Sequence, residues 1–270
     1  MNTTRRTVVR AATAALLLTG SLAACGQSGS GSGAAAGASA GSGTTLKIAT
    51  SNDAPFSYKD PQGNLTGIDG EMINWIAKKK GWTLEVYTTD FATLIPSIGT
   101  KKADIVVDAM YITDERKKKV NFTDVWYTQG EGMVVPGTSA MTKREEAKGK
   151  VIGAQTGTAF IELAKSLGPK EIKYFNSQAE LLKAVENNQV DVAFTDAAVV
   201  AWSLKQKPNP KLKIVTPYTP YFPGAIGAAV RKEDTQLLQD LNSGLKELKA
   251  SPDYLQILQK YGLTQANAAK

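Results

Sequence analysis

Apolar residues from Leu46 onward follow strand and helix periods in turn. Short apolar runs predict β-strands, at residues 46–50, 84–87, 105–107, 151–154, 172–174, 190–194, 212–215 and 225–230. Apolar residues at helical spacing predict helices between them, at 68–80, 91–98, a segment ending at Leu167, 177–187, 197–205, 234–250 and 253–260. Because strands and helices alternate, we expect an α/β fold with mainly parallel sheets and right-handed crossovers.

The first residues carry a different pattern. Arginines at positions 5, 6 and 10 precede an apolar run over residues 11–18. A basic start before a short apolar run is typical of a signal peptide, and this run is too short to span a membrane. We therefore expect a signal peptide over residues 1–24. The Arg5-Arg6 pair leaves twin-arginine export open beside the general secretion route.

The end of this leader contains the only cysteine of the chain. The sequence LAAC, ending at Cys25, resembles the lipobox of bacterial lipoproteins. That resemblance implies that Cys25 is lipidated and anchors the protein to the outer face of the cell membrane. Residues after Cys25 are almost all Gly, Ser and Ala, so we expect residues 25–45 to be a flexible tether.

Composition excludes several kinds of chemistry. A chain of 270 residues with 42% hydrophobic content can bury a large core. The absence of histidine excludes His-based catalysis and His metal sites, and a single cysteine excludes an intrachain disulfide. The net charge of +7 is mild and includes the leader arginines, so it does not indicate nucleic-acid binding. We expect no metal and no cofactor, because the acidic residues do not cluster at calcium-loop spacing.

The stretch ADIVVDAMYITDERKKKVNFTD, residues 103–124, contains the first candidate for ligand binding. Its apolar strand at 105–107 is followed by a loop that carries Arg116. Ligands in open α/β sheets collect at the carboxyl ends of strands, and a guanidinium offers two parallel donors that match a carboxylate. We therefore expect Arg116 to bind a ligand carboxylate. The alternative is a solvated charge, as we expect for the three lysines that follow it.

A second loop, QTGTA at residues 155–159, precedes a predicted helix. Backbone amides at a helix N-terminus can bind an anion, which makes Thr158 a candidate contact for the same carboxylate. Many helices begin in this way, so the pattern gains meaning only beside Arg116.

The 103–124 stretch resembles the ligand-carboxylate loop of the polar amino-acid-binding proteins of bacterial ABC importers, solute-binding protein family 3. In that family an element like ITDER ends in an arginine that binds the ligand carboxylate, which corresponds to Arg116. The resemblance covers nearly all of residues 46–268. It implies a two-lobed type II periplasmic-binding-protein fold, in which each lobe is a mainly parallel sheet flanked by helices and two crossing strands form the hinge.

The expected boundaries follow from this resemblance. Lobe 1 would comprise residues 46–134 and, after the chain returns, residues 220–270 with the two C-terminal helices. Lobe 2 would comprise residues 135–219. Closure of the two lobes would bury the ligand.

The resemblance also implies roles for further residues. The loop SNDAPF resembles a family element whose acidic and aromatic residues touch the ligand, here Asp53 and Phe56. Phe91 occupies a position from which family members cover the ligand with an aromatic ring, and Asp196 ends an element whose acidic residue binds the ligand ammonium. Two alternatives stay open: Phe56 could fill the core, and Asp196 could be the N-cap of the helix at 197–205.

Three positions depart from the family pattern. Ala109 stands where Gly or Ser is usual, Tyr111 stands where a Ser or Thr hydroxyl usually meets the ammonium, and Ala159 replaces a frequent Thr or Gly. The ring of Tyr111 adds a face that attracts a delocalised cation, an arrangement similar to that of ectoine-binding members. Asp108 could instead face a basic side chain.

We therefore expect a lipid-anchored, extracytoplasmic receptor of an ABC importer. It would bind a polar amino acid or related zwitterion by lobe closure, deliver it to the permease and act as a monomer, without catalysis. An ectoine-like compatible solute is the alternative ligand. A cyclohexadienyl-dehydratase-like enzyme is the alternative of another class, with only carboxylates, Lys and Tyr as acid–base groups.

Overall fold

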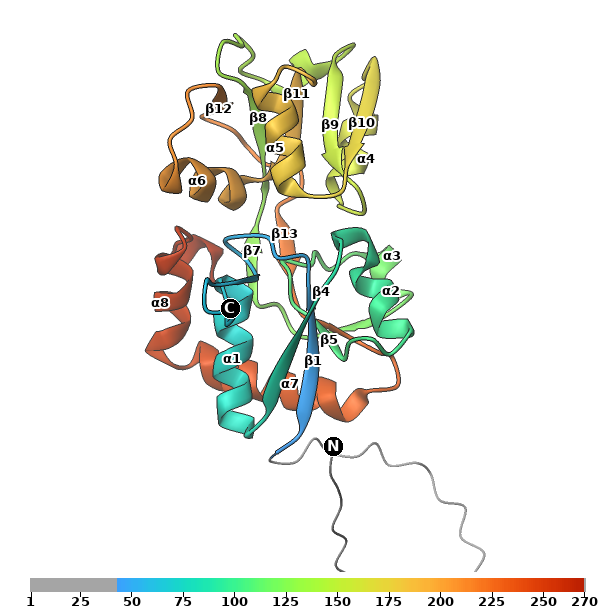
Figure 1. Ribbon diagram of the computed structural model, residues 1–270, viewed down its shortest axis with the longest axis vertical. Coiled ribbons are helices and arrows are strands. Elements are labelled where there is room, and N and C mark those ends of the chain that lie inside the picture. The colour runs from blue at the N-terminus through green and yellow to red at the C-terminus, as the bar shows by residue number, and fades with distance from the viewer. Residues whose placement is uncertain (1–42, 270) are drawn as a thin grey trace, which may run out of the picture. The chain divides into compact units, whose positions relative to one another are not determined.

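A computed structural model of the protein describes residues 43–269. These residues form two lobes, each built on a five-stranded sheet with helices on its faces (Figure 1). Cys25, the predicted signal peptide and most of the predicted tether lie outside the described residues. In residues 43–269, no helix combines the length and the apolar character needed to cross a membrane.

The first lobe contains the sheet β4-β1-β5-β14-β6. Its strands are β1 (Thr45–Thr50), β4 (Thr83–Thr88), β5 (Ile105–Val106), β6 (Asn121–Phe122) and β14 (Ala229–Val230). β1 pairs in parallel with β4 and β5, as the alternation of strands and helices predicts, whereas β14 pairs antiparallel with β5 and β6. The loops that follow β1 and β5 therefore leave the same edge of the sheet, and they carry Asp53 and Arg116.

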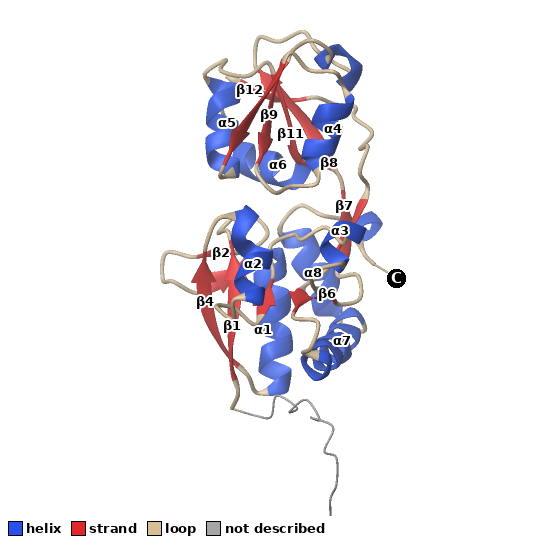
Figure 2. Ribbon diagram, turned by 90° about the vertical axis from the view of Figure 1, so that its right-hand side faces the viewer, coloured by secondary structure: helices blue, strands red, loops and turns tan. Residues whose placement is uncertain are grey.

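The helices of this lobe cover both faces of its sheet (Figure 2). They are α1 (Ile68–Lys80), α2 (Leu94–Gly99), α3 (Asp114–Lys117), α7 (Thr235–Lys249) and α8 (Pro252–Lys260), with a small hairpin of β2 (Tyr58–Lys59) and β3 (Leu65–Thr66) and 3-10 turns at Phe91–Thr93 and Gln265–Asn267. α1 buries Ile68, Met72 and Ile76 at helical spacing and ends at Gly81, where φ is +68°. A left-handed residue at this position is the usual reason for a glycine that ends a helix.

The second lobe contains the sheet β10-β9-β11-β8-β12. Its elements are β8 (Glu131–Pro136), β9 (Val151–Gln155), β10 (Glu171–Phe175), β11 (Val192–Asp196), β12 (Leu212–Ile214), α4 (Phe160–Ser166), α5 (Gln178–Glu186), α6 (Ala197–Gln206) and a 3-10 turn at Arg144–Ala147. β9 pairs in parallel with β10 and β11, and β8 pairs antiparallel with β11 and β12. The carboxyl ends of β9 and β11 therefore meet at one edge, where Gln155 and Asp196 lie.

Two crossing strands, β7 (Tyr127–Gln129) and β13 (Gly224–Ile226), connect the lobes and pair with each other in antiparallel register. Glu131, which is fully buried, joins the two crossings: its carboxylate accepts hydrogen bonds from the Tyr218 hydroxyl at 2.7 Å and from the backbone N–H groups of Tyr221 and Phe222 at 2.6 and 2.9 Å. Three donors satisfy this buried carboxylate without a cation. The hinge is thus a short two-stranded ribbon closed by one acidic side chain.

The contact between α1 and α7 predicts an unusual response to substitution. Gly244→Ala would place Cβ 2.6 Å from Cγ2 of Ile76. We expect this change to lower the free energy of unfolding by roughly 1–3 kcal/mol through overpacking, although Ala normally stabilises a helix relative to Gly. Gly99→Ala is the matched control, because a Cβ there meets nothing within 4 Å and should be neutral or stabilising. Urea unfolding of the two variants measures the difference, and equal effects would contradict the prediction.

Candidate functional site

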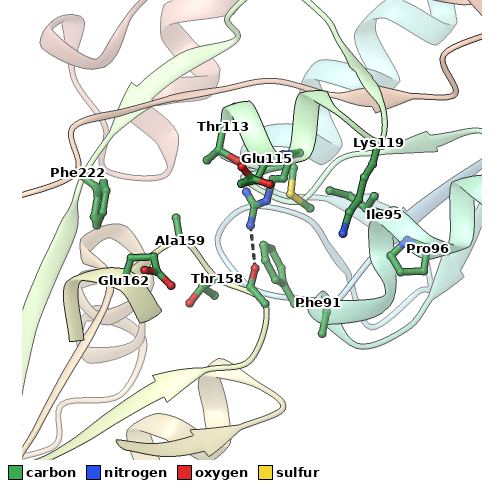
Figure 3. Close-up of a pocket in the computed structure, with 14 residues that line it drawn as sticks. Phe91, Ile95, Pro96, Thr113, Glu115, Lys119, Thr158, Ala159, Glu162 and Phe222 are labelled. Carbon is green, nitrogen blue, oxygen red and sulfur yellow. Dashed lines mark hydrogen bonds between the residues drawn. The ribbon is translucent and has the colours of Figure 1, made fainter. Parts of the chain in front are cut away.

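Arg116 lies between the two lobes. Its own backbone N–H donates to Oγ1 of Thr113 at 3.3 Å, which caps α3 and fixes the start of the side chain. The guanidinium donates from Nη1 to the carbonyl oxygen of Tyr111 at 2.8 Å. It also donates from Nη2 to the carbonyl oxygen of Gly157, in the second lobe, at 2.9 Å, the bond drawn as a dashed line in Figure 3. Its Cζ lies 5.5 Å from the centre of the Phe91 ring. Lys117, Lys118 and Lys119 are exposed, whereas the Arg116 guanidinium donates a hydrogen bond to the other lobe.

A cavity of about 460 Å³ adjoins the Arg116 guanidinium (Figure 3). Both lobes and the segment before β13 contribute to its wall, through Phe91, Ala92, Ile95, Pro96, Met110, Thr113, Glu115, Arg116, Lys119, Gly157, Thr158, Ala159, Glu162 and Phe222. A largely apolar wall with a few polar groups, and a volume of a few hundred Å³, is typical of small-molecule sites. Gly157 has φ +84° and approaches Ala92 so closely that a Cβ would lie 2.8 Å from its Cα. The lobes thus meet where Arg116 crosses between them.

Tyr111 is a buried aromatic residue that touches hinge and second lobe together. Its backbone bridges to Ile226, and its ring packs edge-on against Phe160 with centroids 5.4 Å apart. Only a glycine fits at position 224, because a Cβ there would lie 2.1 Å from the Tyr111 ring. Burial raises the pKa of the Tyr111 hydroxyl well above its ordinary range, and this hydroxyl has no hydrogen-bond partner in the described part of the chain. An unpaired buried hydroxyl is unfavourable, so it is a candidate ligand contact.

Asp53 and Asp108 form an acidic pair at the carboxyl ends of β1 and β5. Asp108 accepts from the backbone N–H of Ser51 at 2.9 Å, from its hydroxyl, and from Oγ1 of Thr50 at 3.2 Å. Asp53 lies 2.9 Å from the same Ser51 hydroxyl, whose single proton can serve only one of the two carboxyl groups at a time. Asp53 also has a long contact of 3.5 Å to Nε2 of Gln155, in the second lobe. Burial raises the pKa of Asp53, and burial together with the charge of Asp53 raises that of Asp108. Among residues 43–269, no Lys or Arg forms an ion pair with either group, and desolvation is the first cause of both shifts.

Asp196 ends β11 and is 7% exposed. Its carboxylate accepts from Nε2 of Gln129 at 2.7 Å and from Nε2 of Gln178 at 3.0 Å. Asp196 occupies the N-cap position of α6, but its side chain makes no capping hydrogen bond, so the N-cap alternative is not realised. Burial, helped by the charge of Asp53, raises its pKa to about 8, although Arg116 and the hydrogen bond from Gln178 act in the opposite direction. Desolvation is thus stronger than the attraction of the guanidinium.

The remaining predicted residues lie in three settings. Phe56 is 2% exposed in the core of the first lobe and does not line the cavity. Ala109 is buried with φ +47°. The backbone N–H and the hydroxyl of Thr158 both donate to the carbonyl oxygen of Gln155, at 3.3 and 2.8 Å. Ala159 is the N-cap residue of α4 and makes no side-chain capping hydrogen bond. The structure thus brings together Phe91, Arg116, Thr158 and Ala159 at the cavity, with Asp53, Asp196 and Tyr111 in the adjoining polar cluster.

The residues near the site that were not sequence-based candidates include Gln129, Gln155, Gln178 and Phe222. Gln129 and Gln155 end strands, so the strand-end rule that selected Asp196 could have found them. Gln178 is in the first turn of α5, where its sequence context does not distinguish it from other polar helix residues. Phe222 lies before β13 in a segment whose sequence has neither strand nor helix periodicity. Within residues 43–269, no group of three or more Asp, Glu or Cys could hold a metal ion.

A family model for the bacterial extracellular solute-binding proteins, family 3, matches residues 46–264. The chain belongs to this family. The two-lobed type II periplasmic-binding-protein fold expected from the resemblance is confirmed.

Relatives and solved structures agree with this assignment. This solute-binding protein is 31% identical to the arginine-binding extracellular protein ArtP of Bacillus subtilis (strain 168), over 92% of this chain and 94% of the relative. It is 32% identical to a probable histidine-binding protein of Neisseria gonorrhoeae, over 89% and 90% of the two chains. The structure of an ancestral arginine-binding protein bound to arginine matches with a TM-score of 0.74 and 34% identity, over 81% of this chain and 98% of that one.

The raised pKa of Asp196 predicts how the stability of the ligand-free solute-binding protein depends on pH. In the unfolded chain the pKa of this carboxyl is near its ordinary value of 3.8. Between that pH and a pH of about 8, the folded state therefore binds a proton that the unfolded state does not. The contribution of Asp196 to the free energy of unfolding therefore increases as the pH falls from about 8 towards about 6. Asp196→Asn should flatten this dependence, as urea unfolding at several pH values would show.

Asp191→Asn is the control for this measurement, because Asp191 is exposed and precedes the same strand. It should leave the pH dependence unchanged. Parallel stability curves for wild type and Asp196→Asn would contradict the prediction.

Proposed function

We propose that this protein is the extracytoplasmic receptor of an ABC importer for an amino acid with a cationic side chain. The observation that supports this most is the charge of the cleft. Asp108 and Asp196 are buried, Asp53 is half-buried and acts electrostatically on both, and Arg116 is the cation that acts on Asp196. Burial is the first cause of the raised pKa of each acid, which is the behaviour of carboxylates whose charge is not fully compensated.

The net charge of the ligand decides how well it suits this cleft. A zwitterion brings one charge of each sign and leaves the excess of buried acid unchanged. An amino acid with a cationic side chain brings one further positive charge, which offsets part of that excess. Because an unpaired buried charge costs several kcal/mol, the second ligand is favoured.

The arrangement of the groups suggests an orientation for such a ligand. The α-carboxylate would bind the Arg116 guanidinium, and the α-ammonium would bind Asp196. The cationic side chain would lie towards Asp53 and Asp108, with Phe91 against the apolar part. Relatives support this choice, since ArtP of Bacillus subtilis is named arginine-binding and the Neisseria gonorrhoeae protein is named histidine-binding.

The anchor and the transport partner complete the proposal. The LAAC ending at Cys25 supports lipidation and attachment to the outer face of the cell membrane. Residues 25–45 would act as the tether, and the folded receptor would act as a monomer that closes on its ligand and passes it to the permease. The lobes would close about β7 and β13, which are short enough to bend.

Ectoine remains a second candidate ligand because of Tyr111. This buried ring lies beside the polar cluster and could face the delocalised cation of a cyclic zwitterion. Binding rather than catalysis is supported by the relatives, which are named as binding proteins. Conversion of a prephenate-like substrate by the purified protein would contradict this part of the proposal.

A ligand panel tests the proposed function. The protein is mixed with L-arginine, L-lysine, L-histidine, L-glutamine or ectoine, and its thermal midpoint is measured. At a hundredfold excess over Kd, binding adds about 2.7 kcal/mol, which should raise the midpoint by roughly 5 to 10 °C. We expect the cationic amino acids to give the largest shift. A response to L-glutamine or ectoine alone would reject the cationic ligand. Asp60→Asn changes a turn outside the cavity and should give the same ligand-induced shift as wild type.

Arg116 gives a second test of the same proposal. Arg116→Ala leaves the ligand carboxylate without its cation, so affinity for the responding amino acid should fall by roughly two to four decades. Arg116→Lys should recover little of it, because an ammonium cannot make two parallel bonds to a carboxylate. Isothermal titration calorimetry measures both, with Lys117→Ala as the exposed neighbour that should bind normally. Unchanged affinity in Arg116→Ala would show that the carboxylate binds elsewhere.

A further inference from the structure

Asp69 is a buried acid that touches neither the cavity nor a cation. It lies in the first turn of α1 and is 2% exposed. One carboxylate oxygen, Oδ2, accepts from the backbone N–H of Ala109 at 2.5 Å, and the other, Oδ1, accepts from the Tyr127 hydroxyl at 2.7 Å. Burial raises the pKa of Asp69 to about 6, and the hydrogen bonds from Tyr127 and Ala109 act in the opposite direction. Each of the two carboxyl oxygens thus has one donor.

The first bond holds a strained residue of the ligand loop. Ala109 has φ +47°, a left-handed conformation that costs a residue with a Cβ roughly 1–2 kcal/mol. Asp108 precedes it, and Met110, which lines the cavity, and Tyr111 follow it. The turn at Ala109 thus sets the directions in which Asp108 and Tyr111 leave the backbone.

The second bond leads into the hinge. Tyr127 is fully buried and begins β7, the first crossing strand. The same strand ends at Gln129, whose Nε2 donates to Asp196 in the second lobe at 2.7 Å. A continuous path therefore runs from Ala109 through Asp69, Tyr127 and β7 to Asp196.

We propose that Asp69 is a positioning residue for ligand binding, which fixes the ligand loop at residues 108–111 to the first crossing strand so that the two halves of the site keep their register. This inference rests on the proposed function of the cleft. A role in packing alone is a weaker explanation. An apolar residue would pack at this position without the desolvation penalty of a buried carboxylate that has no cation. The carboxylate instead provides one acceptor oxygen for the Ala109 N–H and one for the Tyr127 hydroxyl.

Substitutions separate positioning from packing. Asp69→Ala removes both bonds, and we expect its Kd for L-arginine to rise at least tenfold at a temperature where circular dichroism shows a folded protein. Asp69→Asn should remain within about threefold of wild type, because its amide oxygen accepts from Ala109 and its NH₂ can donate to the Tyr127 oxygen. Tyr127→Phe keeps the bond to Ala109 and loses only the tie to the hinge, so its Kd should rise by a smaller factor.

A second substitution, at the left-handed residue Ala109, should restore affinity if Asp69 positions the loop, but not if Asp69 only packs. Glycine adopts positive φ without the Cβ penalty. Ala109→Gly in the Asp69→Ala background should therefore recover part of the lost affinity for L-arginine, compared with Asp69→Ala and with Ala109→Gly alone. The stability lost with Asp69 should not return to the same extent.

Asp104→Ala is the matched control for lost stability. Asp104 accepts from the Lys47 N–H at 2.9 Å and pairs with Arg231 at 2.9 Å, yet it lies outside the path and the cavity. It should lower the thermal midpoint and leave the Kd unchanged.

The closing experiment measures these Kd values by calorimetry on the full-length protein in detergent, together with amide hydrogen exchange of residues 105–112 without ligand. Faster exchange at Ala109 in Asp69→Ala, with the tenfold loss of affinity, supports the inference. Wild-type affinity and wild-type exchange in Asp69→Ala overturn it. If Asp69→Ala does not fold, wild-type affinity in Tyr127→Phe overturns the tie to the hinge. If wild type binds none of L-arginine, L-lysine and L-histidine, the proposed function fails, while the exchange comparison still tests whether Asp69 holds Ala109.

Discussion

The burial of acidic groups between two lobes is the constraint on which the rest of this structure depends. Acidic groups follow β1 and β5 and end β11, close to the place where the lobes meet, and Arg116 is the cation that acts on Asp196. Each carboxylate is held by neutral donors, from Ser51 or from glutamine amides, which satisfy its hydrogen bonds but not its charge. Such a cleft is incomplete without a positive partner from outside. In the proposed function, the fold provides the geometry and a cationic ligand provides the missing charge.

The main features of the fold could be predicted from the sequence because they depend on local patterns. Alternating strands and helices at 46–107 and 151–206 predicted the parallel pairs of both sheets, and Gly81 predicted the end of α1. Arg116 and Asp196 could be selected because both follow strands at the ligand edge. These rules need only the chain itself, since the direction of a strand determines where its end lies.

Other features could not be predicted, because they depend on contacts between distant segments. Phe56 follows the same strand edge as Asp53, yet its ring packs into the core, and no local pattern separates the two outcomes. The partners of Asp196 come from a crossing strand and from α5, and those of Asp69 from the ligand loop and the hinge. Glu131 looked like any polar residue between apolar ones. Its role is visible only when both crossings lie side by side.

Because Gly224 has no Cβ, this position restricts the order in which substitutions near the site can accumulate during evolution. The Tyr111 ring occupies the space that any larger residue at 224 would need. A lineage that replaces Tyr111 by a small residue first can later accept a side chain at 224, whereas the reverse order passes through a clash within the hinge. The two positions are therefore open to change in one order only, and residue 111 must change before residue 224 in the hinge strand.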